Sequence, residues 1–182
     1  PIVPDNLIIT RPGVYKLAYF DSNGRSGDVT TLSVINPPAS TNVKGIGKAT
    51  REEYDFKGSS VKDIPTSGGK TSEVTEISTA GVNRENVALR FKTNIVIPED
   101  GEYALYLTSD DGSALLIAGS TLIDNDGAHA TVTKSTKIKL NKGAYPIEVL
   151  YFQLGGGASL KVEIEGPGLE RQVLGNQFIG LP

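Results

Sequence analysis

Three residue types are absent from this sequence of 182 residues, namely cysteine, methionine and tryptophan, and histidine occurs only once, as His129. Without cysteine the chain can form no disulfide, no thiolate zinc site and no cysteine nucleophile. A single histidine also excludes a metal site built from several imidazoles. Flat stacking surfaces use tryptophan or tyrosine rings, so for any bound ligand the lack of tryptophan favours a small pocket or chain-end site formed by loops.

Long apolar runs and blocks of one charge are missing as well. No apolar run reaches the roughly 18 residues of a membrane helix. The 18 basic and 21 acidic residues give a formal net charge of −3. We therefore expect no membrane span and no nucleic-acid partner. No signal peptide is recognisable and the first residue is proline, so we expect a processed or excised part of a larger protein.

Glycine and proline are plentiful, with 21 and 10 residues, and apolar residues alternate with polar ones. The alternation runs through residues 87–97, 103–107, 145–151 and 160–164. A period of two residues is typical of strands with one buried face, so Arg90, Lys92 and Asn94 are expected on a polar face. No segment of ten or more residues combines helical periodicity with caps. The sequence predicts an all-β fold, an antiparallel β-sandwich or jelly-roll-like barrel.

The chain divides into three parts on composition. Residues 1–36 contain turn signals and strand formers, and predict a small β-hairpin unit. Its segment Gly13–Phe20, followed by Asn23–Ser26, resembles the end of a chitobiase C-terminal or fibronectin-like domain. Residues 37–43 are rich in proline and predict a linker. Residues 44–182 would then form the main sandwich.

Two acidic segments are candidates for binding. Asp110 and Asp111 follow a strand-like segment, and two adjacent carboxylates repel each other unless a cation or sugar hydroxyls relieve the repulsion. The alternative is a simple turn, because Asp and Gly favour turns. Asp124–Gly127 is similar to part of an EF-hand loop, but Thr133 stands where the twelfth-position glutamate belongs, which indicates a hairpin turn.

Several motifs occur in an order and spacing that resemble the PA14 domain family, over about residues 45–180. They are Tyr54–Gly58, Asn86–Phe91, Ile97–Tyr103, Ser109–Ser113, Leu122–His129, Leu140–Ile147, Tyr151–Gln153 and Glu165–Gly168. The resemblance implies a β-sandwich of jelly-roll or barrel type. Such domains are appended to bacterial glycoside hydrolases and sulfatases, and they occur in yeast adhesins and binary toxins.

The resemblance also implies a site. In lectin-like members an Asp-Asp pair joined by a cis peptide helps to hold a calcium ion that binds sugar hydroxyls, and Asp110 and Asp111 match that pair. The second calcium loop corresponds to residues 153–158, which contain no Asn or Asp, so Gln153 or backbone carbonyls would have to complete the 6–8 oxygens that calcium takes. Calcium therefore stays one alternative at this loop. The other wall of a glycan site would be Gly155, Gly156 and Gly157.

These observations predict a non-catalytic, carbohydrate-binding accessory module of a secreted bacterial carbohydrate-active enzyme, such as a β-hexosaminidase-like glycoside hydrolase. Its partners would be a glycan and the catalytic domain of the parent protein. We expect a monomer that is secreted, periplasmic or on the cell surface. The alternative is a structural spacer or protein-docking domain without a ligand.

Individual side chains carry further expectations. Tyr106 and Phe152 lie near the two loops and are expected to pack in the core. His129 is expected to be structural or exposed, since no nucleophile motif accompanies it. Replacing Asp110 and Asp111 by Asn should weaken glycan binding and leave the fold intact.

Overall fold

The computed structural model describes residues 13–17, 23, 30–34 and 43–181. Apart from two short 3-10 helices, η1 (Val61–Asp63) and η2 (Asn176–Phe178), the regular elements of these residues are strands. All of their pairings are antiparallel. The all-β prediction is confirmed, because the period-two segments form strands with one face against a common core.

The larger sheet has eight strands. Six follow the order β3-β14-β6-β11-β8-β9, while β4 pairs with β6 and with β5. The strands are β3 (Lys44–Ile46), β4 (Ala49–Asp55), β5 (Lys70–Val74), β6 (Val87–Ile97), β8 (Ser113–Ile117), β9 (Ser120–Asn125), β11 (Gly143–Gln153) and β14 (Ile179–Leu181). The long central strands β6 and β11 pair along their full length. They form the centre of the larger sheet.

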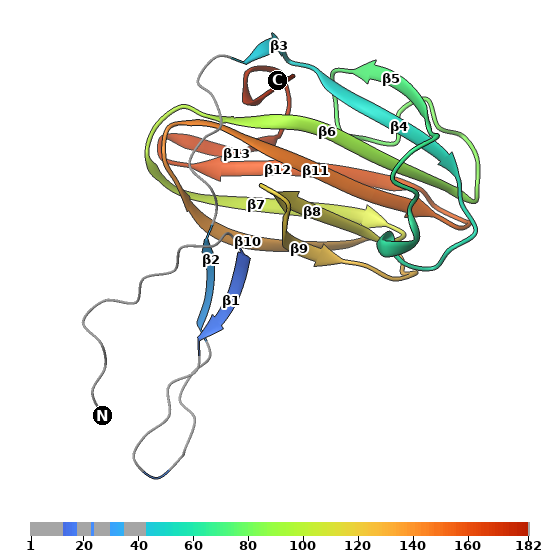
Figure 1. Cartoon of the computed structure of the whole chain (residues 1–182), viewed down its shortest axis with the longest axis horizontal. Helices are drawn as coiled ribbons and strands as arrows, with labels where there is room; N and C mark the ends of the chain where they lie inside the picture. Colours follow the sequence, from blue (N-terminus) through green and yellow to red (C-terminus); the bar gives the residue numbers. More distant parts are fainter. Residues whose placement is uncertain (1–12, 18–22, 24–29, 35–42, 182) are drawn as a thin grey trace.

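The second sheet has four strands in the order β10-β7-β12-β13. They are β7 (Gly101–Asp110), β10 (Val132–Leu140), β12 (Ser159–Gly166) and β13 (Leu169–Val173). Figure 1 shows this sheet behind β6 and β11, so that the two sheets form the layers of a sandwich. Among the described strands the two sheets stay separate, so the barrel is not closed.

The main core lies between the two sheets. Both contribute alternate side chains to one apolar cluster, with Tyr103, Leu105 and Leu107 of β7 facing Leu89 and Phe91 of β6. All five are at most 1% exposed. Burying one such side chain stabilises the fold by roughly 1.5–3 kcal/mol, which explains why the alternation in the sequence is so regular.

A second, smaller core covers the outer face of the larger sheet. Residues 56–69, which include η1, fold over that face, and Phe56 packs against Phe152 with ring centroids 5.2 Å apart. Arg90 lies beneath this segment, is 8% exposed, and donates to the Pro65 carbonyl oxygen at 3.0 Å and to Glu148. The expectation of a polar, solvent-facing row was therefore wrong for Arg90 and Asn94, because other chain segments cover them, and right for the exposed Lys92.

Near the N-terminus, β1 (Gly13–Leu17) and β2 (Thr30–Val34) form an antiparallel hairpin. It projects from the two larger sheets, with β1 contacting β9 (Figure 1). The strands agree with the hairpin that the sequence predicts. Most of the predicted linker at 37–43 lies outside the described residues, and the boundaries 1–36, 37–43 and 44–182 stay predictions.

Candidate functional site

Asp110 and Asp111 lie where β7 ends and turns into β8, and the peptide bond between them is cis. Asp111 is buried, with 7% of its surface exposed. Its two carboxylate oxygens accept backbone N–H bonds from two different loops, Oδ1 from His129 at 3.2 Å and Oδ2 from Leu154 at 2.9 Å. Asp111 thus joins the β9–β10 loop to the β11–β12 loop.

Asp110 lies between the same two loops but keeps part of its surface exposed. Its Oδ2 accepts a bond from the Thr131 hydroxyl at 3.3 Å. On its other side Gly157 comes so close that a Cβ added there would lie 3.5 Å from the Asp110 Oδ2. The site therefore holds one carboxylate fixed inside and one presented between two loops, which suits an acceptor for donor groups of a ligand.

The Gln153 side chain bonds the backbone beside the acidic pair. It is 2% exposed, and its Oε1 accepts from the Asp111 amide N at 3.2 Å. The Tyr151 hydroxyl shares its single proton between this Oε1 at 2.8 Å and the Asp110 carbonyl oxygen at 2.7 Å. Its Nε2 donates to the Gly155 carbonyl oxygen at 2.8 Å. Both lone pairs of Oε1 are engaged, so Gln153 positions the Asp111 backbone and the glycine loop. It would have to give up a bond to ligate a metal.

The glycine loop forms the second wall of the site. Gly155, Gly156 and Gly157 are exposed, and Gly156 has φ +82°, a conformation that side-chain-bearing residues rarely adopt. Glu85, from the loop before β6, lies beside them, with its Oε1 3.4 Å from the Gly156 amide N. Sequence reasoning missed Glu85, because a single acidic residue in a polar segment carries no spacing signal.

His129 holds the β9–β10 loop in shape. Its two ring nitrogens lie 3.0 Å from the Asn125 carbonyl oxygen and 2.8 Å from the Ala130 carbonyl oxygen. Since both partners only accept, both ring nitrogens act as donors in the protonated form. Burial lowers the pKa of His129, but these two carbonyls and the Asp111 carboxylate raise it more, and the net pKa lies above its ordinary value of 6.5. The expectation of a structural histidine agrees with this geometry.

Asp126 in the same loop holds the covering segment. Its carboxylate accepts from the Ser60 hydroxyl and, at 2.8 Å, from the Val61 amide. Asp124 accepts from the Asp126 amide at 3.0 Å. The hairpin turn expected at Asp124–Gly127 is wrong, because Asp124 and Asn125 end β9, and the loop that follows crosses from the larger sheet to β10 of the four-stranded sheet. The two acids instead join loops.

The oxygen atoms around Asp110 and Asp111 fit calcium only in part. Calcium takes hard oxygen ligands, and the two carboxylates lie near the Gln153 amide oxygen and the Gly155 carbonyl oxygen, each of which already accepts a hydrogen bond from the protein. Within the described part of the chain, however, no three His, Asp or Glu side chains lie together as a metal-binding group. Calcium would therefore be held by Asp110 and Asp111 with backbone carbonyls and water, and would supply a charge that attracts sugar hydroxyls.

The two aromatic candidates differ. Phe152 is 0% exposed within the second core, as expected. Tyr106 was expected in the core but lies on the outer face of the four-stranded sheet, because β7 places every second residue outward and residue 106 falls in that row. The Arg171 guanidinium carbon lies 3.9 Å from the centroid of its ring.

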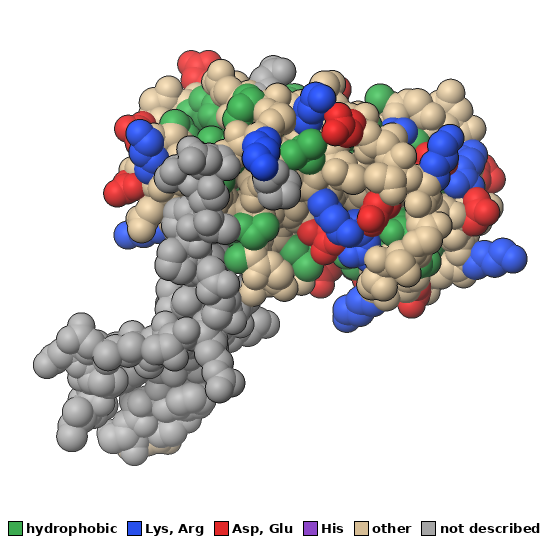
Figure 2. Space-filling model, turned by 45° about the horizontal axis from the view of Figure 1, so that its top comes forward, with side chains coloured by type: hydrophobic (Ala, Val, Ile, Leu, Met, Phe, Trp, Pro, Cys, Tyr) green, Lys and Arg blue, Asp and Glu red, His purple; other side chains and the backbone are tan. Residues whose placement is uncertain are grey.

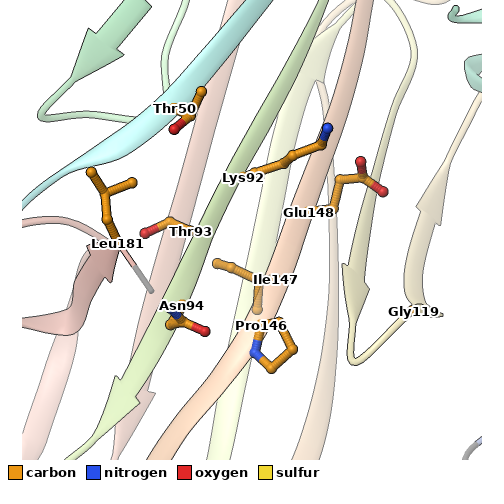
Figure 3. A pocket seen from close by; sticks show the side chains of 9 residues that line it. All are labelled: Thr50, Lys92, Thr93, Asn94, Gly119, Pro146, Ile147, Glu148 and Leu181. Carbon is orange, nitrogen blue, oxygen red and sulfur yellow. The ribbon is translucent and has the colours of Figure 1, made fainter. Parts of the chain in front are cut away.

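A pocket of about 420 Å³ lies elsewhere, on the outer face of the larger sheet. Figure 3 shows it between Leu181 of β14, Asn94 of β6 and Pro146 of β11, with the Asn94 side-chain oxygen directed toward Pro146. None of its lining residues belongs to the Asp110–Asp111 site.

Comparison with protein families decides the relationship. The sequence model of the PA14 domain matches residues 11–175. The chain belongs to the PA14 domain family. The recognition made from the motifs is thereby confirmed, and the match extends further toward the N-terminus than those motifs did.

Solved structures agree with the PA14 fold. An anti-sigma factor domain-containing protein from Clostridium clariflavum is 25% identical, with a TM-score of 0.65, covering 92% of this chain and 60% of that one. A PA14 sugar-binding domain from an RTX adhesin is 17% identical, with a TM-score of 0.61, covering 76% of this chain and 100% of the other. A β-glucosidase from Kluyveromyces marxianus in complex with glucose is 15% identical, with a TM-score of 0.53, covering 65% of this chain and 15% of the enzyme.

This chain spans only part of several relatives. It covers 60% and 49% of two anti-sigma factor domain-containing proteins, so a PA14 domain occurs there within a longer chain. None of the curated proteins compared with the chain matches it. In the described residues no helix is long and apolar enough to cross a membrane.

Proposed function

We propose that this PA14 domain is a non-catalytic module that binds a glycan at Asp110. The observation that carries the proposal is the asymmetry of the acidic pair. Asp111 is buried and fixed by two amides, and Asp110 is presented between Thr131 and Gly157. A carboxylate held in this way accepts hydroxyl donors without losing much side-chain entropy, and charge-assisted bonds are roughly twice as strong as neutral ones.

The glycine loop adds a second reason. Gly155, Gly156 and Gly157 form an exposed stretch without side chains opposite Asp110. Because the Gly155 carbonyl oxygen and the Gly156 amide N already bond Gln153 and Glu85, a ligand would meet this loop chiefly at Gly157. The named sugar-binding PA14 domain of an RTX adhesin, covered over its whole length, supports the same ligand class. Glu85 and Thr131 would contribute further polar contacts at the rim of this site.

The test is glycan binding by wild-type protein and by Asp110→Asn, which keeps the shape of the side chain and removes the charge. We expect binding of at least one neutral glycan on an array and a loss of about tenfold or more in affinity in the variant. Asp100→Asn is the matched control, because Asp100 is an exposed acid at the opposite end of β7. Equal affinity in wild type and Asp110→Asn would place the site elsewhere.

The parent protein that we propose is a secreted bacterial carbohydrate-active enzyme, with this module as a monomeric accessory domain. The β-glucosidase that shares the fold supports a glycosidase parent. The anti-sigma factor domain-containing relatives support a second class of parent, in which the module serves a protein that is not a hydrolase. A binding site at Asp110 is compatible with both, while a spacer or docking domain would show no glycan binding in the same array.

Calcium binding is a separate proposal. We expect calcium to raise the melting temperature by little or nothing, because only two carboxylates converge and Gln153 already uses both lone pairs of its side-chain oxygen. The measurement is thermal unfolding with calcium, with magnesium, and with a chelator. A large rise that calcium alone causes and the chelator abolishes would show that Gln153 rearranges to complete the ligand set.

A further inference from the structure

The outer face of the four-stranded sheet leads directly away from Asp110. Burial alternates along β7, so Asp110, Thr108 and Tyr106 share the outward row. On β12, Ser159 pairs with Asp110 and Lys161 pairs with Thr108. At about 3.3 Å per residue, the four residues from Asp110 to Tyr106 span roughly 13 Å. That is longer than one sugar ring.

Hydroxyl groups line the part of this row nearest to Asp110. The Thr108 and Thr133 hydroxyl oxygens lie 2.7 Å apart across β7 and β10, and the Thr131 hydroxyl bonds Asp110. Because a hydroxyl both donates and accepts, these groups match the hydroxyls of a sugar.

The far end of the row is an aromatic and guanidinium platform. The Arg171 guanidinium stacks on the Tyr106 ring at 3.9 Å and bonds Glu163 at 2.6 Å. The Tyr106 hydroxyl donates to Glu165 at 2.6 Å. Glu163 is buried, with 9% of its surface exposed. Side chains already fixed by such contacts lose little freedom when a ligand packs on them.

The charges on this face are balanced. Arg171 and Lys161 both pair with Glu163, and Lys137 pairs with Glu102 at 2.9 Å. Two of these three cations share Glu163, and Glu165, which bonds the Tyr106 hydroxyl, supplies a third carboxylate, so the row presents no net positive field for an anionic polymer. A neutral ligand fits this face best. Figure 2 turns the top of the Figure 1 view, with β3, β4 and β5, toward the reader, and positive and negative side chains are interspersed there as well.

We propose that the outer face of the four-stranded sheet is a continuation of the site, and that the ligand is a linear neutral oligosaccharide held at Asp110 and again at Tyr106 and Arg171. This inference rests on the proposed function. It replaces the expectation of a small chain-end pocket drawn from the absence of tryptophan. Tyr106 and the Arg171 guanidinium stacked on it provide the flat surface that a tryptophan ring would otherwise provide.

The experiment compares sugars of different length on the full chain. The probes are glucose, galactose, mannose and N-acetylglucosamine, each as monosaccharide, disaccharide and tetrasaccharide, on an array and then by calorimetry. We expect the tetrasaccharide of the preferred sugar to bind about tenfold more tightly than its monosaccharide. Tyr106→Ala and Arg171→Ala should remove that gain and leave monosaccharide binding unchanged. Lys48→Ala is the control, since Lys48 is an exposed, ion-paired cation on the other sheet.

The outcomes separate the two proposals. If none of the probes binds, or if Asp110→Asn leaves binding unchanged, the proposed function fails. If the sugars bind through Asp110 but the tetrasaccharide has no advantage, or Tyr106→Ala and Arg171→Ala retain it, only the extended site is overturned. A preference for anionic oligosaccharides would also contradict the extended site. Circular dichroism of each variant shows that the sandwich is intact.

Discussion

The two sheets share one core but differ on their outer faces. Residues 56–69 cover the outer face of the larger sheet with a second apolar cluster, and Arg90 fastens them there. The outer face of the four-stranded sheet carries Tyr106, Arg171 and hydroxyl groups instead. A face buried under another segment serves stability, and a face left open can meet a ligand. The Asp110–Asp111 turn joins the two sheets at one end.

The sharpest test of this contrast is a matched pair of aromatic deletions. Phe152→Ala removes a fully buried ring from the covered face and should lower the free energy of unfolding by about 3–5 kcal/mol. Tyr106→Ala removes a partly exposed ring from the open face and should cost about 1 kcal/mol. Urea unfolding of both variants measures the difference. Similar losses would mean that both faces are structural.

The two acids should differ in the same way, with Asp111 contributing to stability and Asp110 contributing little. In Asp111→Asn the side-chain amide must face a backbone N–H in place of a carboxylate oxygen, so we expect a loss of about 1–3 kcal/mol in unfolding free energy. Asp110→Asn should stay within about 0.5 kcal/mol. This revises the expectation that Asn at both positions leaves the fold intact, because Asp111 is buried. Equal stability of the two single variants, measured in urea, would contradict the division.

The attachment of the covering segment should show a smaller effect. Asp126→Ala removes the acceptor of the Ser60 hydroxyl and the Val61 amide, and we expect a loss of about 1–2 kcal/mol. Adding Ser60→Ala to this variant should then cost little more, since the two side chains act together. A double-mutant cycle in thermal or urea unfolding measures the coupling. Fully additive losses would show that the contact does not hold the segment.

The smallest effect is expected from pH at His129. Its pKa in the folded protein is raised above 6.5, so its protonation stabilises the fold at lower pH. That contribution is fully present below pH of about 6.5 and is lost as pH rises through the folded pKa. The neighbouring charges are Asp111, which raises the pKa, and Lys134, which lowers it. His129→Gln should flatten the dependence of the melting temperature on pH in this range, and an unchanged profile would contradict the assignment.

Much of the sandwich could be predicted because alternation reports burial directly. Residues 87–97 were recognised as a strand and form β6 over the same range. The covered outer face could not be predicted in this way. Arg90 and Asn94 have polar side chains, and only the fold reveals that a distant segment lies over Arg90 and that Asn94 donates to the Gly180 carbonyl oxygen at 3.0 Å. A period-two pattern identifies one buried face and leaves the other undetermined.

The site was predictable only in part, for a similar reason. Asp110 and Asp111 are recognisable in the sequence because they are adjacent acids, and the glycine run 155–157 is equally visible. The opposite roles of the two acids depend on His129 and Leu154 amides that lie 18 and 43 residues away from Asp111. Glu85 reaches the loop from 71 residues away. Partners at such separations leave no local pattern.

The position of β14 has a consequence for how the chain acquires its structure. This short strand near the end of the sequence lies between β3 and β6, so β3 joins the larger sheet only through residues 179–181. A pairing between segments this far apart closes a long loop, and topologies dominated by such pairings fold in milliseconds to seconds. During synthesis the edge of β6 that β14 covers stays unpaired until residues 179–181 emerge, and an open edge can pair with another chain. The three-residue strand therefore acts late, as the step that completes the sheet and protects it from association.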